Sequence, residues 1–94
     1  TVRVLLVSAG GQTYALPDTA VARVARPADA DYRSVEGRVV LPDSGTLVPV
    51  APLAGLLGLP PREPAGRRPV VILSGTPAAG LAVDELLAVE EVLL

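Results

Sequence analysis

The stretch Arg68-Pro69-Val70-Val71-Ile72-Leu73, followed after a small turn by Gly80-Leu81-Ala82-Val83-Asp84-Glu85-Leu86-Leu87, decides the fold class. The first run is apolar and rich in β-branched residues, which favour strands. The second run stays apolar to Leu94 apart from two acidic pairs, Asp84-Glu85 and Glu90-Glu91. Whether this second run is helix or strand therefore determines the fold class of the domain.

The acidic pairs argue against a helix in the last segment. At about 100° per residue the four carboxylates would fall near about 0°, 100°, 240° and 340°, and no apolar face would remain. In a strand, neighbouring residues point to opposite sides, so each pair needs a bulge, a bend or a chain end. We predict strand, break, strand, and short strands separated by turns indicate a small barrel.

The N-terminal segment predicts a hairpin followed by a short helix. An apolar run, Val2–Ser8, meets Gly10-Gly11, a pair that favours a tight turn into a strand over Thr13–Leu16. Asp18 can cap a helix from Thr19 to about Val24, in which Val21 and Val24 share a face.

The middle of the chain predicts a second hairpin. A strand over Val35–Leu41 is followed by the turn Pro42-Asp43-Ser44-Gly45 and a returning strand, Thr46–Val50. Pro49 cannot donate to a ladder, so the returning strand is an edge or carries a bulge there. A short apolar helix is expected over Pro52–Leu57.

The Pro- and Gly-rich stretch from Leu59 to Arg67 is the only linker-like part of the chain. We expect it to join two lobes, residues 1–58 and 67–94, of one domain spanning residues 1–94, because neither lobe is large enough to fold alone. The second lobe contains the predicted strands Pro69–Leu73 and Gly80–Val83, with a turn over Ser74–Ala78.

Composition disfavours several classes of function. The 94 residues contain no cysteine and no histidine, which removes the common zinc ligands, a thiolate nucleophile and the most frequent general base. Two aromatic residues, Tyr14 and Tyr32, cannot form a base-stacking platform, and a net charge of −2 disfavours phosphate contacts. No apolar run reaches the length of a membrane span. We expect a cytoplasmic, non-catalytic domain with no cofactor, no metal, no nucleic-acid partner and no membrane insertion.

The acidic pairs are the main candidate for chemistry. A catalytic dyad needs two carboxylates that converge on one bond, and sequence neighbours on a strand diverge. A small-barrel accessory domain that binds a cation or a polar ligand through Asp84-Glu85 and Glu90-Glu91 is the alternative function. A module for proline-rich peptides is a weaker reading, because the chain lacks an aromatic-lined groove.

Read in order, the segments resemble the CheW-like domain of bacterial chemotaxis, which occurs as the free coupling protein CheW and as the C-terminal regulatory domain of the kinase CheA. The matching pieces lie across almost the whole chain: Leu5-Leu6-Val7, Gly10-Gly11-Gln12-Thr13-Tyr14-Ala15-Leu16-Pro17, Ala20-Val21-Ala22-Arg23-Val24, Val35-Glu36-Gly37-Arg38, Gly45-Thr46-Leu47-Val48-Pro49-Val50, Leu56-Leu57-Gly58-Leu59, Pro69-Val70-Val71-Ile72-Leu73 and Gly80-Leu81-Ala82-Val83-Asp84-Glu85-Leu86.

This resemblance implies an all-β fold of two small SH3-like β-barrels with short helices and no catalytic site. It also implies an adaptor that couples chemoreceptors to a CheA-type histidine kinase, through contacts with CheA/CheW-type proteins and with the cytoplasmic tips of chemoreceptors. The positions that correspond to partner-binding residues are Gly37, Gly45, Val71 and Val83.

Two departures from the family pattern bear on partners. Where CheW carries an Asn-Leu-Arg-Gly turn, this chain has Leu41-Pro42-Asp43-Ser44-Gly45, without the arginine. Family members also continue through further strands, so we expect a fold that is incomplete at its C-terminus. Unpaired strand edges would then allow a homodimer or a strand swap. The sequence leaves open whether the parent protein is a CheA-type kinase or a free coupler.

Overall fold

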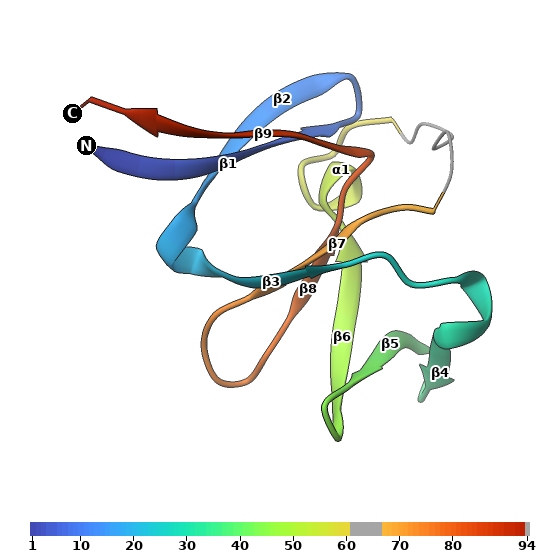
Figure 1. Cartoon of the computed structure of the whole chain (residues 1–94). Coiled ribbons are helices and arrows are strands. Elements are labelled where there is room, and N and C mark those ends of the chain that lie inside the picture. The colour runs from blue at the N-terminus through green and yellow to red at the C-terminus, as the bar shows by residue number, and fades with distance from the viewer. Residues whose placement is uncertain (61–66, 94) are drawn as a thin grey trace.

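The computed structural model describes residues 1–60 and 67–93 and shows an all-β arrangement of two sheets (Figure 1). The smaller sheet has the order β2-β1-β9, and all of its pairs are antiparallel. Its strands are β1 (Val2–Ala9), β2 (Gln12–Pro17) and β9 (Glu85–Val92). The predicted all-β class is confirmed.

The larger sheet has six strands in the order β3-β7-β8-β6-β5-β4. Their bounds are β3 (Val21–Ala25), β4 (Arg33–Val35), β5 (Arg38–Asp43), β6 (Thr46–Pro52), β7 (Val70–Leu73) and β8 (Gly80–Ala82). Two 3₁₀ turns, η1 (Asp18–Ala20) and η2 (Asp29–Asp31), flank β3, and the short helix α1 (Leu53–Leu56) follows β6. The β6–β8 pair is parallel and the others are antiparallel.

The larger sheet bends strongly. Arg23 on β3 forms an ion pair with Asp43 at the end of β5, although β3 and β5 are the first and fifth strands of the sheet. Ala25 of β3 also packs against the core cluster that contains Leu41 of β5. The sheet therefore curves back toward its own first strand, as expected for a small barrel.

Strand β7 supplies both halves of the core. Val71 belongs to a cluster with residues of β1 and α1, whereas Val70 and Ile72 belong to a second cluster with residues of β5, β6 and β8. Neighbouring residues of a strand point to opposite faces, and both faces of β7 are buried. This burial is the reason for an uninterrupted apolar run in place of an alternating one.

The N-terminal hairpin and the final segment form as predicted. Gly10 and Gly11 adopt φ values of 58° and 82° between β1 and β2. The last segment is strand, break, strand, since β8 ends at Ala82 and β9 begins at Glu85. The register of β9 on β1 shifts next to Leu87, which makes this residue a bulge.

The predicted helix over Thr19–Val24 is wrong. A single 3₁₀ turn ends at Ala20, and the following residues form β3 on the edge of β7. The register of β3 shifts between Val21 and Arg23. This bulge puts the two valines, three residues apart, on the buried side of a strand, so a helical spacing arises without a helix.

The middle of the chain differs in detail from its prediction. The expected strand over Val35–Leu41 is interrupted by a turn at Glu36 and Gly37, whose φ values are 51° and 76°. The next turn lies at Ser44 and Gly45, with φ values of 50° and 80°, so Pro42 is inside β5 and the predicted turn was placed too early. In both hairpins two adjacent positive φ angles set the turn.

Pro49 lies where β6 changes partners. It stands opposite Val40 of β5, and pairing with β8 begins only at Val50. At Pro49 the strand therefore has no partner among the described residues on the side that faces β8, and its lack of an N–H breaks no ladder there. This agrees with the prediction that the strand is an edge at Pro49.

Both sheets take strands from both sides of the Pro- and Gly-rich stretch. Strand β1 pairs with β9, β3 pairs with β7, and β6 pairs with β8. Residues 61–66 of that predicted linker lie outside the described residues.

Candidate functional site

The acidic residue at the break before β9 has a structural role. Asp84 Oδ2 accepts a hydrogen bond of 2.9 Å from the N–H of Gly10, and the N–H of Asp84 donates to the carbonyl oxygen of Ser8 at 2.8 Å. Arg68 Nη2 lies 3.8 Å from Asp84 Oδ1. Asp84 thus joins the β1–β2 turn to the β8–β9 break, where its carboxylate is largely buried.

The turn held by Asp84 is also packed tightly from the other side. A Cβ atom placed on Gly10 would lie 2.7 Å from Cβ of Leu59, a separation that real Cβ atoms do not show. Gly10 also has a positive φ of 58°. Both the backbone conformation and the contact with the segment after α1 therefore require glycine here.

The two acidic pairs do not converge on a site. Glu85 is exposed, while Asp84 is engaged by the N–H of Gly10. Glu90 and Glu91 stand opposite Val4 and Arg3 of β1, on opposite faces of the smaller sheet. Among residues 1–60 and 67–93, no group of three acidic, histidine or cysteine residues is arranged to hold a metal ion.

The four predicted partner-binding residues fall into two sets. Gly37 and Gly45 occupy the turns at opposite ends of β5, and a Cβ atom added to either would meet nothing within 4 Å. Val71 and Val83 are 0% exposed and lie together in the core cluster between β1 and α1. The structure brings the two valines together and leaves the glycines apart on the surface.

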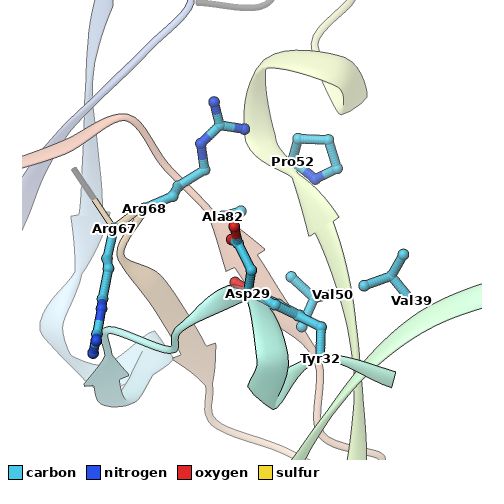
Figure 2. Close-up of a pocket in the computed structure, with 8 residues that line it drawn as sticks. All are labelled: Asp29, Tyr32, Val39, Val50, Pro52, Arg67, Arg68 and Ala82. Carbon is cyan, nitrogen blue, oxygen red and sulfur yellow. The ribbon is translucent and has the colours of Figure 1, made fainter. Parts of the chain in front are cut away.

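A cavity of about 340 Å³ opens on the larger sheet (Figure 2). Its apolar lining comes from β5, β6 and β8, and its polar lining from η2 and from the chain before β7. The lining residues are Asp29, Tyr32, Val39, Val50, Pro52, Arg67, Arg68 and Ala82. The guanidinium groups of Arg67 and Arg68 point in different directions in Figure 2, so they do not form one anion clamp.

Tyr32 is the titratable group that this environment perturbs. Burial raises the pKa of the Tyr32 phenol, and the charge of Arg68 opposes this by lowering it. The nearby carboxylates of Asp29 and Asp31 raise the pKa further. Sequence reasoning missed this cavity because its lining comes from segments that are distant in the sequence, and no local pattern around Tyr32 indicates it.

Aliphatic side chains are exposed in three regions of the described surface. They lie on the β4–β5–β6 part of the larger sheet, on α1 and just after it, and along β9. These residues are Val35, Val39, Leu47, Leu56, Leu57, Leu87, Val89, Val92 and Leu93. In the described part of the chain, no helix is long and apolar enough to cross a membrane.

The structure thus defines a small two-sheet, all-β domain with exposed aliphatic side chains. The sequence profile of the CheW-like domain matches residues 3–93, and the chain belongs to that family. It is a family of scaffolding domains in chemotaxis signal transduction. No curated protein sequence matches the chain.

A solved structure supports the same fold. The crystal structure of the scaffolding protein TtCheW from Thermoanaerobacter tengcongensis is similar to this chain with a TM-score of 0.79 and 20% sequence identity. The similarity covers 94% of this chain and 63% of TtCheW. The chain therefore spans less than two thirds of the length of that scaffold.

Proposed function

We propose that this domain is a non-catalytic adaptor that couples chemoreceptors to a CheA-type histidine kinase in the bacterial cytoplasm. The match to the CheW-like family over residues 3–93 carries this proposal. The exposed aliphatic side chains are compatible with it, since a protein partner would bury them. Its partners are CheA/CheW-type proteins and the cytoplasmic tips of chemoreceptors, with self-association through a sheet edge as a further mode.

The predicted partner-binding residues act in two ways under this proposal. Gly37 and Gly45 set the shape of two exposed turns, which can contact a partner directly. Val71 and Val83 are buried, so they act by holding β7 and the β8–β9 break in place. Substitutions at the turns are then expected to change binding without changing the core.

Calorimetric titration of the purified domain against cognate CheW, CheA and a receptor-tip fragment tests the proposal. Binding to at least one of the three is expected. Leu47→Asp places a charge on an exposed aliphatic residue of β6 and should weaken binding. Thr19→Asp is the matched control, because it adds the same charge at an exposed, polar position in η1, outside the two turns of β5. Absence of binding to all three partners would refute the adaptor function.

The cavity beside Tyr32 makes a ligand-binding accessory domain the second candidate function, at a site other than the acidic pairs considered from the sequence (Figure 2). Its volume of about 340 Å³ lies near the lower end of the range for small-molecule sites. Thermal unfolding with a panel of small anions and metabolites tests it. Stabilisation that Val50→Trp abolishes would support the site, and no stabilisation by any compound would remove it.

A further inference from the structure

The smaller sheet ends in two edges that differ in charge. Strand β1 is central, so the outer edges belong to β2 and β9, and no described strand pairs with either (Figure 1). An open edge presents backbone N–H and C=O groups that can pair with another strand. Which edge accepts a strand depends on what its side chains and its regularity allow.

The edge of β9 is protected against self-pairing. It carries Glu85, Glu90 and Glu91, which are all exposed, and antiparallel pairing with a second β9 would gather these like charges along one edge. The bulge at Leu87 also interrupts its regular hydrogen-bonding pattern. Charges and bulges are the usual means by which edge strands avoid association.

The edge of β2 carries neither protection. Its sequence, Gln12-Thr13-Tyr14-Ala15-Leu16-Pro17, contains no charged residue, and its pairing with β1 runs without a register shift from Gln12 to Pro17. The single proline lies at the end of the strand, so the preceding positions keep their N–H groups. When two copies of β2 pair antiparallel, no charged side chains of the two strands face each other in any register.

Side chains on both faces of β2 are compatible with a neighbouring copy. Tyr14 and Leu16 are half-buried against the core, on the same face as Leu5 and Val7 of β1. Thr13 and Ala15 are small, exposed and on the opposite face. A second β2 would place aromatic and aliphatic residues next to Tyr14 and Leu16, a pairing that stabilises sheets.

We propose that two copies of this domain associate through β2, antiparallel and about a two-fold axis, to form one continuous six-stranded sheet in the order β9-β1-β2-β2-β1-β9. Such an interface is isologous, because the same strand is used on both copies. The inference rests on the self-association included in the proposed function and assigns it to one edge. It does not require any chemotaxis partner to bind.

Sedimentation velocity of the purified domain over a wide concentration range tests this pairing. A reversible dimer is expected, and Ala15→Lys should weaken it at least about tenfold, because two cations would then meet at the paired edge. Val92→Lys adds the same charge at an exposed position of β9 and is the matched control. Thr13→Lys repeats the test at a second exposed position if Ala15→Lys lowers stability.

Amide hydrogen exchange of the unmodified domain gives a readout that needs no variant. Amides of β2 should gain protection as the concentration rises, while those of β9 should not. A strictly monomeric domain at every concentration, protection confined to β9, or equal weakening by Val92→Lys and Ala15→Lys would each overturn the proposal. Loss of CheA, CheW or receptor binding with the dimer intact would count against the adaptor function alone.

Discussion

Removing the carboxylate of Asp84 should destabilise the domain, because this group joins two segments 74 residues apart in the sequence. The hydrogen bond from the N–H of Gly10 to Asp84 Oδ2 is 2.9 Å long and partly buried. A hydrogen bond to a charged group contributes about 1.5–3 kcal/mol. The contact with Arg68 at 3.8 Å is at the limit of an ion pair and adds about 0–1 kcal/mol.

We therefore expect Asp84→Ala to lower the free energy of unfolding by about 2 kcal/mol. For a domain of this size, that corresponds to a decrease in Tm of about 10 °C. Urea denaturation followed by circular dichroism measures the change, and an unchanged m-value would show that the unfolding reaction itself is the same.

Glu85→Ala is the matched control, since it removes the same charge from the next residue, which is exposed. Its effect should stay within about 0.5 kcal/mol. If Asp84→Ala and Glu85→Ala destabilise the domain equally, the structural role of Asp84 is wrong. If divalent cations stabilise the unmodified domain and neither variant, the acidic pair is a cation site instead.

Three further predictions concern the core and Tyr32. Gly80→Ala should lower the free energy of unfolding by about 1–3 kcal/mol, because its Cβ would lie 2.9 Å from Cγ1 of Val70. In urea denaturation, the double variant Gly80→Ala/Val70→Ala should lose less stability than the sum of the two single variants. Val83→Ala should cost about 2 kcal/mol in the same assay, whereas Val39→Ala, at a residue 52% exposed, should change stability by less than about 0.5 kcal/mol. Because burial raises the pKa of Tyr32, its contribution to the free energy of unfolding should be complete below about pH 10 and should be lost as the pH rises through the folded-state pKa. Tyr32→Phe should remove this loss of stability at alkaline pH when stability is measured as a function of pH.

Local signals were sufficient where backbone conformation or side-chain alternation alone sets the structure. Gly10-Gly11 predicted the hairpin because few other residues adopt two adjacent positive φ angles. The acidic pairs excluded a helix after Ala82 because four spread charges leave no apolar face. The apolar, β-branched run Val70–Leu73 predicted a strand, which the structure confirms as β7.

Prediction from sequence failed where tertiary pairing sets the structure. The segment after Asp18 has the apolar spacing of a helix, but pairing with β7 and a bulge between Val21 and Arg23 produce that spacing in a strand. The cavity beside Tyr32 combines residues from η2, β5, β6 and β8, whose proximity depends on a curved sheet. Neither feature has a local signal, because the residues that decide it are distant in the sequence.

Substitutions can weaken partner binding either by lowering the folded fraction or by removing a direct contact, and a binding assay alone does not distinguish the two. The burial of Val71 and Val83 allows them to be distinguished. Truncation of either valine opens a cavity in the cluster between β1 and α1, so weaker partner binding would follow from a smaller folded population. Gly37 and Gly45 border open space, and a substitution there strains only a turn whose φ is positive. Binding measured at equal folded fraction therefore isolates direct contact: an effect that persists at the glycines and vanishes at the valines would assign the partner surface to the two turns of β5.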